Sequence, residues 1–498
     1  IIMNNLGPLL QYLRDNNVKA LPKPYQLSDE PETQMEQLYL RMAELGSADD
    51  PKLQLEFFGK GQRANANFRK AKSRLYYQML NAVLIATPER AHITGIDKAY
   101  LQALRHMMAG YIISMYSNPH HGIPYFKECL KLSQKYELSV PAYLSSQQLS
   151  GYYGLNLMNA KEFKRYHKIE QQTLNDVVTE NKLSSIYSEI YSVLEHKMIS
   201  YENKQLLKEK FEETKSLKGK SKTARATRFY YNILAVISYF EKDYQQTITT
   251  CNQAIEKLKK YPYKLDFHIF TFQLKRLMAL IQIENWKTAI ELCTYYKVAK
   301  ISDQTTFIAQ YYLFIIYMRT SKYEEAREVL REEMAPLLEK MKQPIYDENF
   351  QIFNTYIQFL EQRGILDASL KRFRIQRFLN DVPTYSKDKQ GLNSSVLILQ
   401  ILFFLHQKNY SNIIDRVDAL KQYSYRYLRK DETLRTNLFI KMLNSMVKAD
   451  FNRIRTERYV EPLWEQLRSV SINISEQGIE VEILPFEQLW PMVLEMLE

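Results

Sequence analysis

The residues able to carry chemistry are thinly scattered along this 498-residue chain. It contains none of the spacings typical of zinc proteases, serine hydrolases, phosphate-binding loops or dinucleotide-binding folds. Gly59-Lys60-Gly61 is a lone GxG, because Ala64 stands where a third glycine would be needed. We therefore predict that the protein is not an enzyme and that it binds no cofactor.

Metal ligands are equally sparse in the sequence. His120 and His121 adjoin Pro119, but adjacent side chains point apart, and no Cys or Asp lies nearby along the chain. A zinc site needs three or four converging ligands. We interpret this histidine pair as part of a solvated turn and predict no metal site.

The cysteines Cys129, Cys251 and Cys293 form no CxxC pair and no disulfide framework. We expect them to be small buried packing residues of a reduced protein. No basic stretch followed by an apolar core opens the chain. Its longest apolar run, Val396–Leu405, is too short to span a bilayer. These features predict a cytoplasmic protein without a membrane partner.

The strongest local charge signal lies at Lys60–Tyr77, where no acid occurs between Glu56 and Glu89. Three of its bases, Arg63, Lys70 and Arg74, are expected to share one face of a predicted helix over about 66–86, opposite the apolar residues of that helix. Such a face suits the phosphates of a nucleic acid or an acidic partner, and it is also typical of a plain solvated surface. The six bases are Lys60, Arg63, Arg69, Lys70, Lys72 and Arg74.

The amino-acid composition indicates the fold class of the chain. The chain has only 13 glycines among its 498 residues, far below the usual share of about 7% of residues. A chain so poor in glycine has few of the strained turns on which α/β enzymes depend. The formal net charge of +12 permits an anionic partner without requiring one. We predict an all-α protein.

A loosely repeated helical-hairpin pattern runs through the chain and is clearest at Tyr231–Ile255. In each copy an aromatic residue opens the second helix of a pair, and copies recur about every 41 residues, the length of two packed helices with their turns. One pair cannot bury its own apolar face, so the pairs are expected to stack into an α-solenoid. The opening aromatics are Phe163, Tyr244, Trp286, Tyr323 and Tyr410.

The copies at 228–261 and 307–337 resemble tetratricopeptide repeats (TPRs). The resemblance rests on the alternation of bulky and small residues that lets neighbouring helices cross closely. Ser238, Thr247, Cys251 and Phe314 depart from the pattern. The matching residues are Tyr231, Leu234, Ala235, Tyr244 and Ala254 in the first copy, and Leu313, Tyr317, Tyr323, Ala326 and Leu330 in the second.

The resemblance implies that a protein or peptide binds on the concave face lined by the first helices. The Lys and Asn with which some family members grip a C-terminal carboxylate are missing, since Asn232 and Val236 stand at those positions. The alternative is that these residues simply pack against neighbouring helices. The expected groove residues are Asn232, Val236, Tyr239, Ile308, Tyr311, Ile315 and Met318.

The predicted organisation has three parts: an N-terminal helical module with a basic third helix over 1–95, a TPR-like array of stacked antiparallel hairpins over 96–450, and a C-terminal helical cap over 451–498. The favoured function is a non-enzymatic scaffold that binds a protein or peptide. The alternative is a DNA-binding regulator, with a helix-turn-helix-like N-terminal module and a helical-repeat sensor domain.

Overall fold

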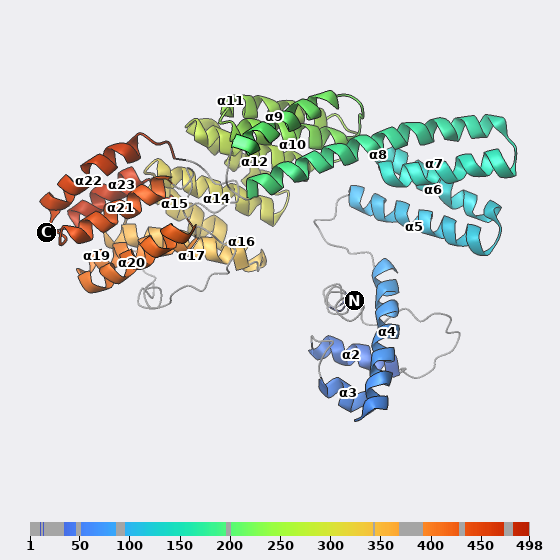
Figure 1. The fold of residues 1–498 in the computed structure, drawn as a ribbon, viewed down its shortest axis with the longest axis horizontal. Coiled ribbons are helices and arrows are strands. Elements are labelled where there is room, and N and C mark those ends of the chain that lie inside the picture. Colours follow the sequence, from blue (N-terminus) through green and yellow to red (C-terminus); the bar gives the residue numbers. More distant parts are fainter. Residues whose placement is uncertain are drawn as a thin grey trace. The chain divides into compact units, whose positions relative to one another are not determined.

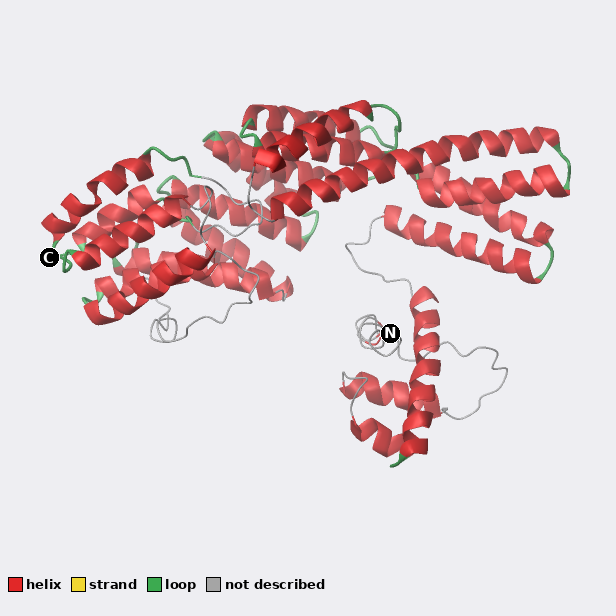
Figure 2. Ribbon diagram, viewed as in Figure 1, coloured by secondary structure: helices red, strands yellow, loops and turns green. Residues whose placement is uncertain are grey.

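The structure is a computed structural model, and every regular element in its described part is a helix (Figure 1, Figure 2). The prediction of an all-α fold is confirmed for these residues. The described residues are Leu10, Leu13, 34–45, 51–85, 95–195, 201–341, 344–367, 392–427, 434–472 and 482–497.

Two compact units make up the chain, Ile1–Thr94 and Gly95–Glu498. Residues 451–498, expected as a separate cap, fall within the second unit. In the first unit, the three-residue turn between the second and third helices has both of its glycines, Gly59 and Gly61, at positive φ. Its helices are α2 (Gln34–Leu45), α3 (Pro51–Phe58) and α4 (Gln62–Ile85), and they enclose a core that includes Leu38, Met42, Leu53, Leu75 and Met79.

The second unit begins with four helices, each packed against the next (Figure 1). α5 and α6 cross closely because two glycines meet there. A Cβ on Gly122 would lie 2.5 Å from the carbonyl oxygen of Gly110, and a Cβ on Gly110 would lie 2.8 Å from the Phe126 ring. The elements are α5 (Gly95–Tyr116), α6 (Pro119–Tyr136), α7 (Ser139–Gly151), the π-helical turn η2 (Tyr152–Asn156) and α8 (Ala160–Glu195).

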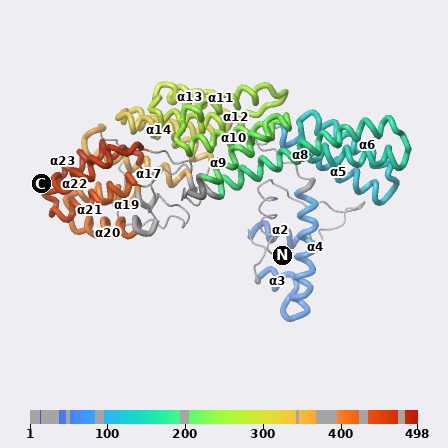
Figure 3. Tube along the Cα trace, turned by 45° about the horizontal axis from the view of Figure 1, so that its top comes forward, coloured from blue at the N-terminus to red at the C-terminus, as the bar shows by residue number. Residues whose placement is uncertain are grey.

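The middle of the second unit continues this succession of packed helices (Figure 3). Its elements are α9 (Tyr201–Ser216), α10 (Ala224–Phe240), α11 (Tyr244–Leu258), α12 (Asp266–Gln282), α13 (Trp286–Ala299), α14 (Asp303–Arg319), α15 (Tyr323–Glu328), the π-helical turn η3 (Val329–Met334), α16 (Ala335–Met341) and α17 (Pro344–Gln362).

The last described helices complete the main core of the second unit, in which Phe439 stacks on Phe486 with ring centroids 4.1 Å apart. They are α19 (Leu392–His406), α20 (Tyr410–Tyr427), α21 (Leu434–Lys448), α22 (Arg453–Arg468) and α23 (Phe486–Glu495).

One turn geometry recurs along this unit at intervals of 37 to 44 residues. In each copy one residue has positive φ, and the amide of the next residue donates to the carbonyl five positions back, over 2.9–3.1 Å. This left-handed ending closes the preceding helix. An Asp or Asn then caps the next helix in several copies, as Asp243 accepts from the Gln246 amide. The positive-φ residues are Lys242, Glu284, Ser321, Gly364, Lys408 and Asp450.

Candidate docking site on helix α5

The expected concave groove does not form an open surface. Tyr311 packs on Phe353 of α17 with ring centroids 5.0 Å apart, and α14 is covered by its neighbours on nearly all sides. Six of the seven groove residues are buried, and the seventh, Ile308, is half-buried against the main core. The assignment is therefore corrected: these residues hold helices together. The six buried ones are Asn232, Val236, Tyr239, Tyr311, Ile315 and Met318.

Helix α5 carries apolar residues on two opposite faces. Its inner face, with Ala99, Ala103 and Gly110, is buried against the rest of the unit. Its outer face is exposed and bears large apolar side chains at helical spacing, which we call the outer stripe. A helix that is apolar all round is normally buried. The outer stripe consists of Leu101, Met108, Ile112 and Met115, the last two 52% and 76% exposed.

A second group of exposed apolar residues, which we call the apolar tip, comprises the last residue of α5 and residues in and just after η2. His120 Nδ1 lies 2.8 Å from the Tyr152 hydroxyl, and this contact joins the first turn of α6 to η2. The α5–α6 and α7–α8 turns accordingly lie at the same end of these four helices (Figure 1). Exposure of this kind in a cluster marks an interaction surface. The tip consists of Tyr116, Leu155, Leu157 and Met158, of which three are more than 80% exposed.

Basic residues begin immediately after the apolar tip. Lys161, Lys164 and Lys168 are exposed and share one face of the first turns of α8. Arg165 pairs with Glu162 over 3.3 Å. Within the described part of the chain, no ion pair joins the three lysines to a carboxylate. The surface next to the tip therefore favours an acidic group.

The basic helix predicted in the N-terminal unit is α4, and it begins at Gln62, earlier than expected. Lys72 is buried, with its Nζ 5.2 Å from the centre of the Phe68 ring. The prediction that Lys72 is an exposed contact residue is therefore wrong. The position of Lys72 between the buried Ala71 and Leu75 explains this burial, because the side chain lies along the core boundary. The five exposed bases are Lys60, Arg63, Arg69, Lys70 and Arg74.

A buried carboxylate joins three helices of the second unit. Glu180 of α8 accepts hydrogen bonds from the hydroxyls of Ser139 and Thr223, each over 2.6 Å. Arg225 Nε lies 3.7 Å from its other oxygen. Burial raises the pKa of Glu180, and the two hydroxyls and Arg225 oppose that rise in part. Since Ser139 begins α7 and Thr223 caps α10, this carboxylate connects helix ends.

A histidine nearby is held neutral. Burial, and then the positive charge of Arg228, lower the pKa of His268 to about 4, while Asp97 acts in the opposite direction. Arg228 Nη1 lies 3.0 Å from His268 Nε2. Burial also lowers the pKa of Arg228. Strongly shifted groups are common at functional sites and in structural networks alike. Here the contact links α10 to α12.

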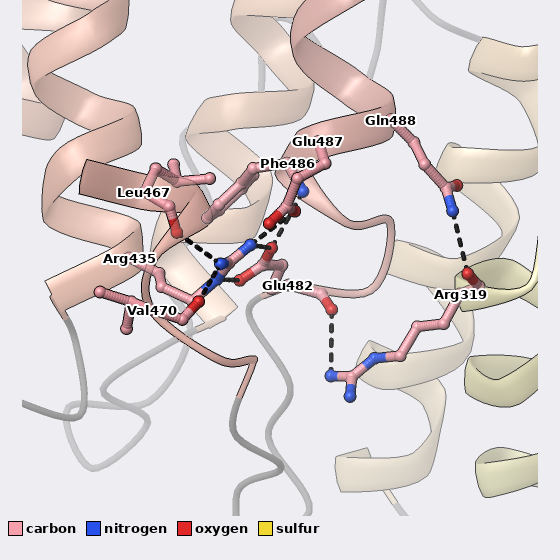
Figure 4. A network of polar contacts seen from close by, with 8 residues as sticks. All are labelled: Arg319, Arg435, Leu467, Val470, Glu482, Phe486, Glu487 and Gln488. Carbon is pink, nitrogen blue, oxygen red and sulfur yellow. Dashed lines mark hydrogen bonds and ion pairs between the residues drawn. The ribbon is translucent and has the colours of Figure 1, made fainter. Parts of the chain in front are cut away.

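The C-terminal helices are held by Arg435, which uses donors on all three guanidinium nitrogens (Figure 4). Nε and Nη2 donate to the two oxygens of Glu482 over 2.9 and 2.7 Å, and Nη2 also donates to Glu487 over 2.6 Å. Nη1 donates to the carbonyls of Leu467, over 2.8 Å, and Val470. The arginine thus ties α21 to the end of α22 and the start of α23. This arrangement is a structural clamp.

The same region is connected to α14. Arg319 donates to the Glu482 carbonyl over 3.4 Å, and the Gln488 amide donates to the Arg319 carbonyl over 2.9 Å (Figure 4). Residues after 450 are therefore an integral part of the second unit.

The three cysteines are buried, as predicted. Burial raises the pKa of the Cys251 thiol to about 12 and also raises that of Cys293. Thiols in this state are poor nucleophiles. In the described ranges, no three His, Cys, Asp or Glu residues are grouped to hold a metal, and no helix there has the length and apolarity to cross a bilayer.

Comparisons with protein-family models, curated proteins and solved structures found no match for this chain.

The outer stripe was missed by the sequence reasoning, although a signal was present. Leu101, Met108, Ile112 and Met115 follow helical spacing in addition to the inner residues of α5. A helix with two apolar faces normally has both of them covered by neighbouring elements. The composition of a single helix does not reveal which face its neighbours leave open.

Proposed function

We propose that this protein is a non-enzymatic protein-binding scaffold, built as a solenoid of TPR-like helical hairpins, and that it docks an amphipathic helix of a partner protein on the outer stripe of α5. The recurrent left-handed turn, at intervals of 37 to 44 residues, supports the repeat architecture. It agrees with the interval of about 41 residues between the aromatics that open second helices.

The observation that carries the docking proposal is the exposed outer stripe itself. Leu101, Met108 and Met115 follow one another at seven-residue intervals, and Ile112 lies four residues after Met108. This is the spacing of the seam along which two helices pack in a coiled coil. Methionine side chains adapt readily to a partner surface. A helix is therefore the partner element that fits the stripe best.

Charge indicates the composition of that partner helix. The lysines Lys161, Lys164 and Lys168 lie on the helix that follows the apolar tip, and their charges are not compensated by described carboxylates. A partner that extends from the outer stripe past the apolar tip would meet them with acidic residues. Such rim charges contribute more to selectivity and association rate than to affinity.

Affinity capture of the tagged full-length chain from the cells that produce it tests the proposal. Met108→Lys/Ile112→Lys should lose at least one partner that the wild type retains, with a drop in affinity of about tenfold or more, because two charges would enter an apolar seam. Tyr295→Lys/Val298→Lys is the matched control, since it adds the same charge at exposed apolar residues of α13. An unchanged set of partners for the α5 variant would overturn the proposal.

A further inference from the structure

Helix α4 of the N-terminal unit presents a second surface that the proposed scaffold function does not use. Six of its residues recur every three or four positions and therefore share one side of the helix. All six are exposed. We call them the polar strip: Arg63, Asn67, Lys70, Arg74, Tyr77 and Asn81.

The positive charge of the polar strip is not compensated. No acid occurs between Glu56 and Glu89 in the sequence. Among the described residues, no ion pair joins Arg63, Lys70 or Arg74 to a carboxylate. Solvated helix faces usually mix both signs and gain support from pairs three or four residues apart. This face lacks that support, which favours an anionic ligand.

The opposite face of α4 holds the strip in place. Phe68, Leu75 and Met79 are buried in the core shared with α2 and α3. The Phe58 and Phe68 rings, 5.6 Å apart, pack α3 on α4 beside the short Gly59–Gly61 turn. The strip is thus carried by an anchored helix, and it extends over about 27 Å at 1.5 Å per residue.

The residue types of the strip match the edges and backbone of duplex DNA. Arginine and lysine contact phosphates and guanine, asparagine amides pair with the adenine edge, and the tyrosine hydroxyl can donate to a phosphate. A helix fits the major groove of B-form DNA but cannot read the deep, narrow major groove of duplex RNA. We propose that α4 binds in the major groove of double-stranded DNA, with its polar strip facing the base edges and phosphates.

Fluorescence polarisation of the full-length chain with a duplex of about 20 base pairs, at about 50 and about 200 mM salt, tests this assignment. Wild type should bind with an affinity that falls steeply with salt. Arg63→Gln/Lys70→Gln/Arg74→Gln should bind at least about tenfold more weakly, and its log–log salt slope should be smaller by about 2 to 3, because each lost phosphate contact removes about 0.9.

The control variant is Lys218→Gln/Lys220→Gln/Lys222→Gln, which removes three exposed positive charges from the segment between α9 and α10. It should keep the wild-type affinity and slope. Circular dichroism should show equal helix content for both triple variants, because all six substituted side chains are exposed. The assignment is overturned if wild type shows no salt-dependent binding, if the control weakens equally, or if single-stranded RNA or an acidic polypeptide competes better than the duplex.

Discussion

At the scale of single residues, most of the buried charge in the second unit serves to join helices. Glu180 connects α7, α8 and α10, and Arg435 connects α21, α22 and α23. Buried polar groups of this kind are stable only when their partners are present. They therefore make the packing of particular helices sensitive to pH and to substitution.

His268 gives the clearest pH dependence. Because its pKa falls from 6.5 to about 4 on folding, its contribution to stability is complete above pH 6.5 and is lost as the pH falls toward 4. The loss should amount to about 3 kcal/mol of unfolding free energy by pH 4. In His268→Gln this part of the acid dependence should disappear. Urea unfolding at several pH values between those limits would measure it, and an identical acid dependence in both proteins would contradict the prediction.

At the scale of elements, helix ends and helix crossings determine the fold. Non-glycine residues at five of the six recurrent turns accept a left-handed conformation that costs about 1 kcal/mol. The repetition of that turn indicates that packing of the flanking helices outweighs the cost. The α5–α6 crossing depends in the same way on two small residues, Gly110 and Gly122.

Gly122→Ala should destabilise the protein. Its new Cβ would meet the Gly110 carbonyl and the Ser114 hydroxyl, so the two helices would have to separate, at a cost of about 1–3 kcal/mol. Gly151→Ala is the control, because nothing lies within 4 Å of a Cβ at that helical position. It should raise stability by up to about 1 kcal/mol. Thermal unfolding of both variants would check the opposite signs, and a stable Gly122→Ala would disprove the close crossing.

Much of the element pattern could be predicted from the sequence. The aromatics Tyr244, Trp286, Tyr323 and Tyr410 each stand two residues after a left-handed turn residue. Scarce glycine and helical periodicity indicated an all-α chain. The candidate site was harder to predict, since burial depends on which neighbours cover a face. Phe307, Tyr312, Leu313 and Ile316 lie on different sides of α14 and are all buried, which is typical of a helix that is apolar all round and argues against a groove.

At the scale of the whole molecule, the two units carry surfaces of different chemistry. The first bears an acid-free polar strip on α4, and the second bears an apolar stripe on α5. We propose that the stripe holds a partner helix. This proposal would be tested separately from DNA binding, because the residues involved belong to different units.

Site-specific photocrosslinking tests that claim most directly. A photoreactive phenylalanine analogue would replace Ile112 on the outer stripe or, as the control, the more exposed Val298 on α13. Irradiation in the producing cells should give a discrete crosslinked species from position 112 and none from position 298, and Met108→Lys in the same chain should abolish it. A position 112 that crosslinks no protein, or no more than position 298 does, would contradict docking of a partner helix on the outer stripe.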